Sequence, residues 1–160
     1  MKKIMTISAA FLFYAATIAA AATIISCEKY EDGRPLKNVR SEFKSMYPDA
    51  RDVEWDSEYG YWVVSFELGT RPAMKECEAW YDVNANWLRT ETEMFERDLP
   101  KAVKDALESS EYASPYLQID DVDYVETPKG NFYQVDVKTA GREIGLDVTA
   151  EGVISLSDIR

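Results

Sequence analysis

The sequence predicts an α+β protein in which two tandem units, each a helix followed by four strands, form one antiparallel sheet with both helices on one face. Three observations predict this class. Apolar residues recur at helical spacing in two short stretches, and each stretch begins beside a proline. Each is followed by four runs with the period-two alternation of strands. The whole pattern occurs twice, with a period of about 65 residues, which is longer than the usual solenoid repeats.

The start of the chain has the form of an export signal. Two lysines come first, and no charged residue occurs from Ile4 to Ser26. The run ends in Ile24-Ile25-Ser26-Cys27, which resembles a bacterial lipoprotein signal. We therefore expect residues 1–26 to be a signal peptide and Cys27 to carry lipid, which would hold the exported protein in the bacterial cell envelope, on a periplasmic or outer-membrane surface. The alternatives are an uncleaved membrane anchor and cleavage within Ala19–Ala22.

The composition is strongly acidic. The sequence has 29 acidic and 18 basic residues and a net charge of −11. A protein with this charge is repelled by the phosphate backbone of nucleic acids and by anionic lipid headgroups. We therefore expect no nucleic-acid partner, and contact with the membrane only through the N-terminal lipid. A basic partner would suit the charge, and so would an acidic solvated surface with no specific partner.

The expected domain follows a short tether. Residues 27–34 are polar and charged and predict a lipidated tether. The domain then occupies residues 35–160, with repeat units at 35–94 and 98–159. In the first unit, Pro35 begins a helix and Pro48 ends it. The apolar stripe of this helix is Leu36, Val39, Phe43 and Met46.

The run Gly60–Leu68 is the most strand-like part of the sequence. Its uniformly apolar set is expected to face the core and consists of Trp62, Val64, Phe66 and Leu68. The other strands of the first unit are expected at residues 52–56, 76–83 and 87–93. In the third strand, the residues expected to point inward are Cys77, Ala79, Tyr81 and Val83.

The second unit repeats this order. Asp98 is the expected N-cap of a helix that has Pro100 in its first turn and ends by Ser114. The apolar stripe of this helix is Leu99, Val103, Ala106 and Leu107. Four strands are expected at residues 119–126, 131–138, 142–148 and 153–157. The hairpin turns of the two units align with Asp82-Val83-Asn84-Ala85 opposite Asp147-Val148-Thr149-Ala150.

These residues carry a resemblance to a known family. Pro35-Leu36 through Tyr47-Pro48-Asp49-Ala50, followed by an alternating strand, looks like the start of a PepSY-like unit. The hairpin from Leu146 to Val153 is similar to the one that ends such units. Two tandem units behind a lipoprotein signal resemble the periplasmic PepSY-like family, described as having a beta-lactamase-inhibitor-like fold, over residues 35–159. The resemblance implies an open sheet face able to hold a protein partner, but it supplies no catalytic residues and does not imply inhibition of a beta-lactamase.

The sequence offers little for catalysis. It contains no histidine, which removes Ser-His and Cys-His nucleophile pairs and the commonest transition-metal ligand. It has no glycine-rich phosphate loop and no cysteine pair with zinc spacing. Cys77, the thiol that remains if Cys27 is lipidated, alternates with core residues and is expected to be buried. We therefore predict a non-enzymatic protein with no cofactor and no metal.

Two groups of acidic residues allow another interpretation. The spacing of an EF-hand-like calcium loop is matched by Asp82, Asn84, Asn86 and Glu93, but Trp87 stands where that loop needs glycine. Flanking helices are also absent, so we expect an Asx-type hairpin turn. A second group is expected to be solvated charge on an edge strand and consists of Asp120, Asp121, Asp123 and Glu126. A calcium or small-ligand module on the hairpin carboxylates remains an alternative.

Aromatic side chains form the candidate binding site. Tyr61, Trp80 and Phe132 are expected to project from the face opposite the core, and we expect Trp87 to join them. Tryptophan and tyrosine are enriched among the residues that anchor protein interfaces, although cross-strand pairing would also explain these rings. The predicted function is a non-enzymatic envelope lipoprotein that binds a protein or peptide, with inhibition as one form of that binding. A structural envelope protein with no soluble ligand is the further alternative.

Overall fold

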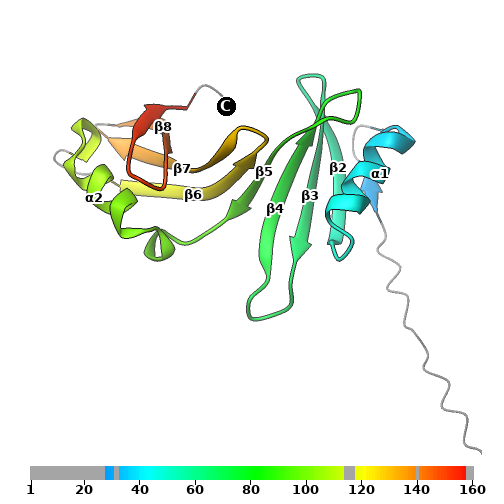
Figure 1. Ribbon diagram of the computed structural model, residues 1–160, viewed down its shortest axis with the longest axis horizontal. Coiled ribbons are helices and arrows are strands. Elements are labelled where there is room, and N and C mark those ends of the chain that lie inside the picture. Colours follow the sequence, from blue (N-terminus) through cyan, green and yellow to red (C-terminus); the bar gives the residue numbers. More distant parts are fainter. Residues whose placement is uncertain (1–27, 31–32, 114–117, 140, 158–160) are drawn as a thin grey trace, which may run out of the picture.

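The computed structural model describes residues 28–30, 33–113, 118–139 and 141–157 and confirms the α+β class (Figure 1). The predicted signal peptide and Cys27 lie outside these residues. Within the described part of the chain, no helix has the length and apolar character needed to cross a membrane.

The elements follow the order expected from the sequence, with additions at both ends of the first unit. The described residues form the helices α1 (Lys37–Met46) and α2 (Lys101–Ser109) and the 3-10 turns η1 (Glu96–Asp98) and η2 (Glu111–Ala113). The first five strands are β1 (Lys29–Tyr30), β2 (Arg51–Glu58), β3 (Tyr61–Leu68), β4 (Lys75–Tyr81) and β5 (Trp87–Glu93). The remaining strands are β6 (Gln118–Thr127), β7 (Gly130–Thr139), β8 (Arg142–Val148) and β9 (Ile154–Leu156).

The nine strands of the described residues belong to one mixed sheet, and they lie in it in chain order. From β2 to β9 every neighbouring pair is antiparallel, as expected. The exception is β1, which pairs in parallel with β2 through Tyr30 and Trp55. Residues 29 and 30, which lie within the expected tether, therefore extend the sheet. Glu28 helps to hold them, because its Oε1 lies 2.8 Å from Nζ of Lys44 on α1.

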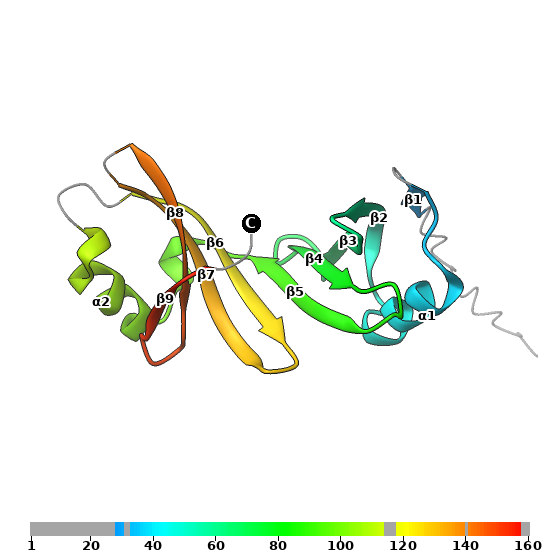
Figure 2. The same cartoon turned by 90° about the horizontal axis from the view of Figure 1, so that it is seen from above.

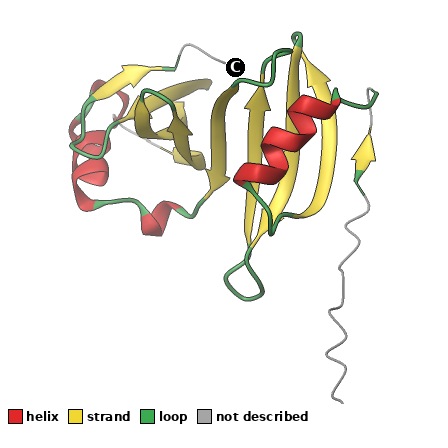
Figure 3. Cartoon of the chain, turned by 45° about the vertical axis from the view of Figure 1, so that its right-hand side comes forward, coloured by secondary structure: helices red, strands yellow, loops and turns green. Residues whose placement is uncertain are grey.

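An aromatic core joins α1 to the first half of the sheet. Val39 and Phe43 are fully buried and lie four residues apart on one face of α1. The Phe43 ring lies 5.4 Å from the Trp55 ring and 5.0 Å from the Phe66 ring, both in edge-to-face contact. Figure 3 shows α1 lying across the strands that supply these rings. Val83, which we expected to point inward, is instead exposed, because β4 ends at Tyr81 and the chain turns.

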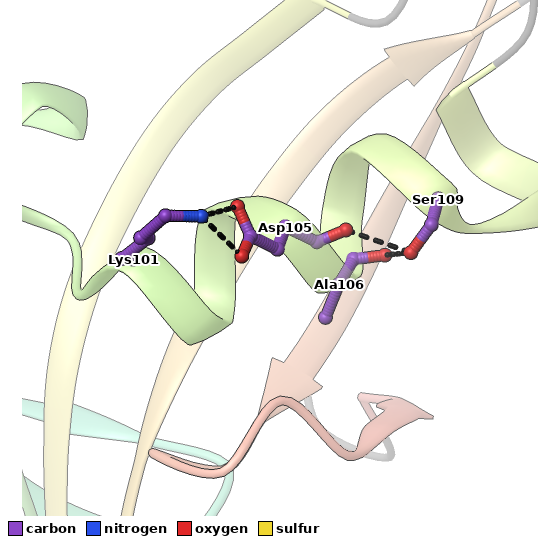
Figure 4. A network of polar contacts seen from close by, with 4 residues as sticks. All are labelled: Lys101, Asp105, Ala106 and Ser109. Atoms are coloured by element: carbon purple, nitrogen blue, oxygen red, sulfur yellow. Dashed lines mark hydrogen bonds and ion pairs between the residues drawn. The ribbon is translucent and has the colours of Figure 1, made fainter.

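An aliphatic core joins α2 to the second half of the sheet. Val103 and Leu107 are buried against valine and leucine side chains of β6, β7 and β8. On the solvent side of α2, Lys101 pairs with Asp105 at 2.6 Å, and Ser109 donates a hydrogen bond to the Asp105 carbonyl (Figure 4). The expected start of this helix was wrong, whereas its end agrees with the expected stop by Ser114. Pro100 occupies the N-cap position because Asp98 belongs to η1, and the helix ends at Ser109, after which η2 follows.

The strand register places both helices on one face of the sheet. Cys77 belongs to the core beneath α1 and lies opposite Thr92, which in turn lies opposite Tyr124. Tyr124 shares a face of β6 with Val122, which packs beneath α2. The sheet twists strongly between the two halves, so that α1 and α2 lie at opposite ends of the molecule (Figures 1 and 2).

The hairpins that close the two halves share one backbone pattern. Asp82 donates its backbone N–H to Asn86 and accepts from Ala85, and Thr149 makes the same bonds with Val153 and Gly152. Asp82 therefore corresponds to Thr149 and not, as the sequence alignment suggested, to Asp147. The alignment was shifted by two residues because it matched an aspartate with an aspartate, whereas the backbone hydrogen bonds set the turn.

Candidate binding face

The face of the sheet opposite the two helices is called the open face here, because both described helices pack on the other side. In a strand, alternate residues share a face, and residues directly opposite each other point the same way. The register therefore assigns to the open face the alternate residues Tyr61, Val63 and Ser65 of β3, Glu76, Glu78 and Trp80 of β4, Arg89, Glu91 and Glu93 of β5, Asp121, Asp123 and Val125 of β6, and Phe132, Gln134 and Asp136 of β7.

An aromatic and charged cluster lies on the N-terminal part of this face. The rings of Tyr61 and Trp80 are 6.3 Å apart in edge-to-face contact. The guanidinium group of Arg89 lies over the Trp80 ring at 4.6 Å from its centre, and Nε1 of Trp80 donates a 2.9 Å hydrogen bond to Glu78. Trp80 is therefore fixed by three neighbours, while Tyr61 remains 42% exposed.

Two valines on the open face are covered by side chains. Val63 is 2% exposed and Val125 is 0% exposed, although no described helix packs on this side. Trp80 lies directly opposite Val63, and Phe132 lies directly opposite Val125. Trp80 and Phe132 are therefore placed to shield these valines, so they contribute to the stability of the sheet as well as to its surface.

A hollow with an acidic lining crosses the middle of the open face. Its volume is about 480 Å³, and it spans β3 to β6. Six of its lining residues carry carboxylates, namely Glu76, Glu78, Glu91, Glu93, Asp121 and Asp123. Ser65 and Cys77 complete the described lining, which contains no basic residue. We call this the acidic hollow.

Burial raises the pKa values of three carboxyl groups that line the acidic hollow. Loss of solvent raises the pKa of Glu91 to about 7, although Nη2 of Arg89 lies 2.9 Å from its Oε1 and opposes the shift. Loss of solvent also raises the pKa of Asp123 to about 6, and the neighbouring Asp121 and Glu93 add to the shift. The pKa of Glu78 is raised for the same main reason. These carboxylates are thus poorly hydrated and only partly compensated by a cation.

A second hollow lies beside the first, over β5 to β8. Its volume is about 720 Å³. Its apolar side is formed by Trp87, Leu88, Pro128 and Phe132, and Arg89, Gln134 and Asp147 also line it. Arg89 and Glu91 alternate along β5, and Gln134 lies opposite Asp123, so the two hollows adjoin. We call this the apolar hollow.

The structure brings together three of the four predicted aromatic residues on the open face. Tyr61 and Trp80 contact each other, and Phe132 lies on the same face in the apolar hollow. The expected placement of Trp87 was wrong. A register shift at Trp80 and Tyr81 sets Trp87 opposite Tyr81, so that Trp87 packs against the core beneath α1, and it also lines the apolar hollow.

The expectation that the acidic residues of β6 lie on an edge strand was wrong, although Asp120 and Asp121 are exposed as expected. β6 is not an edge strand, because it pairs with β5 on one side and β7 on the other. Asp121 and Asp123 therefore face the acidic hollow in the middle of the sheet. A signal for this arrangement was present. Three strands each carry two carboxylates two residues apart, and such residues share a face: Glu76 with Glu78, Glu91 with Glu93, and Asp121 with Asp123.

The carboxylate proposed as a calcium ligand has another role in the structure. Oδ1 of Asp82 accepts 2.8 Å hydrogen bonds from the backbone N–H groups of Asn84 and Asn86, and Oδ2 accepts from the Asn86 side chain at 2.7 Å. This is the Asx-type turn that the sequence predicted. Among the described residues, no group of three or more histidine, cysteine or carboxylate side chains is arranged to hold a metal ion.

Comparison with known proteins relates this chain to solved structures of similar fold. A beta-lactamase-inhibitor-like protein from Bacteroides fragilis NCTC 9343 shares 30% identity, with a TM-score of 0.66 over 77% of this chain and 84% of that chain. A DUF2874 family protein from Bacteroides ovatus ATCC 8483 shares 28% identity, with a TM-score of 0.66 over 76% of this chain and 85% of that chain. A protein from Bacteroides eggerthii DSM 20697, described as a proposed periplasmic protein, shares the fold at 21% identity, with a TM-score of 0.65 over 76% of this chain and 86% of that chain.

No curated protein matches the sequence. The model of the PepSY-like family, whose members are described as beta-lactamase-inhibitor-like, matches residues 60–155. This match begins at the turn before β3 and ends within β9, so it includes the strands that form both hollows. The family's description is inhibitor-like and names no enzymatic activity. The chain belongs to the PepSY-like, beta-lactamase-inhibitor-like family.

Proposed function

We propose that this protein is a non-enzymatic binding module of the cell envelope that holds a protein partner against its open face. The observation that carries the proposal is the pair of adjoining hollows on a sheet face that no described helix covers. A sheet face of this kind offers a protein partner a broad surface with separate charged and apolar regions.

The aromatic residues of the open face would anchor the partner. Trp80 is held in place by Tyr61, Arg89 and Glu78, so it loses little side-chain freedom when a partner packs on it. Phe132 presents a ring to the apolar hollow. Pre-ordered aromatic side chains near the centre of an interface are the usual source of its binding energy.

The family supports binding over catalysis. Its members are described as beta-lactamase-inhibitor-like, which suggests that this chain too could act by occupying another protein. The absence of histidine in the sequence is consistent with a binding role. We further propose that the two helix-and-strand halves are tandem units of one binding domain, and that the chain is exported. The proposed periplasmic location of the Bacteroides eggerthii neighbour supports the second point.

Affinity capture from envelope extract tests the function. The full chain, produced with its own N-terminus and a C-terminal tag, is compared with the double variant Trp80→Ala and Phe132→Ala. We expect a defined partner to be retained by the unaltered chain and lost by the double variant. A matched control removes two exposed apolar side chains from the helix side of the sheet, with Leu36→Ala and Leu156→Ala, and should retain the partner.

The melting temperatures of both double variants must first show that they are folded, because Trp80 and Phe132 also shield valines. Recovery of the same partner by all three proteins would exclude the open face as the binding surface. Failure to retain any defined partner on the unaltered chain would count against the binding function itself.

A further inference from the structure

The acidic hollow and the apolar hollow favour different chemical groups on a partner. Because the two hollows adjoin, one segment of the partner can supply both groups. Six carboxylates line the acidic hollow, and its described lining contains no lysine or arginine. Like charges held close together raise one another's energy, and this cost increases when solvent is removed. A partner that covered this hollow with apolar or acidic groups would increase the cost, whereas a partner cation would reduce it.

Arg89 neutralises the acidic hollow only in part. Its guanidinium group lies between the Trp80 ring, at 4.6 Å, and Oε1 of Glu91, at 2.9 Å. Both the Arg89 and Glu91 side chains are largely buried, with 13% and 15% exposed. Arg89 is therefore engaged at the boundary between the hollows. The carboxylates of Glu93, Asp121 and Asp123 lie beyond it, toward the other end of β5 and on β6.

The apolar hollow favours a different group. Trp87, Leu88, Pro128 and Phe132 supply apolar surface to a volume of about 720 Å³, which is large enough for an aromatic or branched aliphatic side chain. Burial of such a side chain contributes free energy without a charge requirement. The apolar hollow is therefore suited to an anchor residue that lies close to the cationic group of the same partner.

We propose that the partner's binding segment is cationic and apolar in composition, with lysine or arginine side chains in the acidic hollow and an aromatic or large aliphatic side chain in the apolar hollow. This inference rests on the proposed function and specifies its partner. Charge selects among the possible occupants. A nucleic acid or an anionic membrane would bring more negative charge to the face, and so would a second copy of this chain, whose net charge is −11.

Binding of synthetic peptides to the purified full chain tests the inference. The first probe is an eight-residue peptide that alternates lysine with phenylalanine. The second has glutamate in place of every lysine, and the third has serine in place of every phenylalanine. Isothermal titration calorimetry at low salt should show binding of the first peptide, no binding of the glutamate peptide, and binding of the serine peptide weaker by about tenfold or more.

Variants of the chain assign the two parts of the site. At pH 8, where both carboxylates are largely ionised, Glu91→Gln with Asp123→Asn should weaken binding of the lysine–phenylalanine peptide by about tenfold or more at low salt, and the difference should shrink at high salt. Phe132→Ala should weaken the same peptide by a similar factor at any salt concentration. The matched control is Glu42→Gln with Glu108→Gln, which removes the same charge from the exposed surfaces of the two helices and should leave the affinity unchanged.

Several results would overturn the inference. Absence of binding by the lysine–phenylalanine peptide would do so, and so would equal binding by the glutamate peptide. If the serine peptide bound as tightly as the lysine–phenylalanine peptide, the proposed apolar anchor of the partner would be excluded. These failures are distinct from failure of the proposed function. A partner captured through Trp80 and Phe132 would keep the function intact even if every peptide result went against a cationic segment.

Discussion

The two halves of this molecule use the same order of elements to build chemically different cores. Beneath α1, the buried side chains include Phe43, Trp55, Phe66 and Tyr81, whose rings contact one another. Beneath α2, the buried side chains are all valine or leucine. The backbone pattern of the closing hairpins is nevertheless the same. The arrangement is therefore maintained by strand pairing and helix position, while the residues that fill each core can vary.

The difference extends to the open face. Tyr61, Trp80 and Arg89 cluster on the aromatic half, whereas the apolar hollow lies mostly on the aliphatic half. The acidic hollow lies between these regions, where β5 of the first half pairs with β6 of the second. A partner that covers both hollows would therefore contact both halves at once.

The largest expected effect comes from truncating equivalent core residues of the two helices. Phe43→Ala should lower the free energy of unfolding by about 4 kcal/mol, because it removes a ring from a cluster of rings. Leu107→Ala should lower it by about 3 kcal/mol, because it removes a smaller side chain. Urea denaturation measures both values. A larger loss for Leu107→Ala would show that the aliphatic core is the more tightly packed of the two.

The next largest effect is expected where the β8–β9 hairpin approaches α2 closely. A Cβ atom at Gly152 would lie 2.9 Å from the Ala102 carbonyl oxygen and 3.1 Å from the Ala106 Cβ, and the φ angle is +87°. Gly152→Ala should therefore destabilise the protein by about 3 kcal/mol, as measured by urea denaturation. Gly60→Ala is the control, since Gly60 has a φ of +86° with no atom within 4 Å. It should cost about 1 kcal/mol from the backbone alone. Equal losses would show that the contact with α2 is unimportant.

The buried carboxyl groups where β5 meets β6 should make the stability of the protein depend on pH. The pKa of Glu91 rises from 4.5 to about 7 on folding, so its stabilising contribution is complete below the unfolded pKa and is lost as the pH rises through about 7. Asp123 behaves in the same way, with a folded pKa of about 6. The groups that face Glu91 are Arg89, Glu78, Glu93, Asp121 and Asp123. Among these described groups, Arg89 alone opposes the shift by its charge.

We therefore expect the free energy of unfolding to fall by about 2 kcal/mol between about pH 5 and pH 8, as measured by urea denaturation. Glu91→Gln should remove much of this fall because the amide does not ionise. Glu108→Gln, an exposed change on α2, should leave it unaltered. A pH profile for Glu91→Gln that matched the unaltered chain would show that this carboxylate is well hydrated in the folded protein.

The smallest expected effect concerns the equivalent residue of the first hairpin. Ala85 corresponds to Gly152 and also has a positive φ, of 71°. Ala85→Gly relieves backbone strain but removes a methyl group that packs against the aromatic core. The change in the free energy of unfolding should therefore be less than about 1 kcal/mol in either direction. Thermal denaturation of this variant beside Gly152→Ala would show whether equivalent turn positions tolerate opposite substitutions.

Much of the fold could be predicted from the sequence because local patterns determine it. Alternation along β3 placed Trp62, Val64 and Phe66 on the helix side, and the burial of Val64 and Phe66 agrees with it. The side chain of Asp82 identified its own turn. The strand β1 could not be predicted, since two residues show no periodicity and their pairing depends on contacts such as that between Glu28 and Lys44.

The candidate site was predicted only in part, because its acidic region depends on the pairing of β5 with β6. Tyr61, Trp80 and Phe132 were found from alternation within single strands. The face of Trp87 depends on a register shift between β4 and β5, which alternation within one strand does not reveal. The acidic hollow requires β5 to lie beside β6. The spacing of Asp121 and Asp123 was visible in the sequence, but their position in the middle of the sheet was not.

The chain-order arrangement of the sheet also bears on how fast the protein folds. Each strand pairs with its immediate neighbours in sequence, and the chain segments that must be closed are short except where a helix lies between the paired strands, from β1 to β2 and from β5 to β6. Low contact order of this kind is associated with rapid folding, even in proteins rich in strands. The strands also emerge from the ribosome in the order in which they pair. The hairpins of the aromatic half can therefore form in sequence, before the strands of the aliphatic half are available to pair with them.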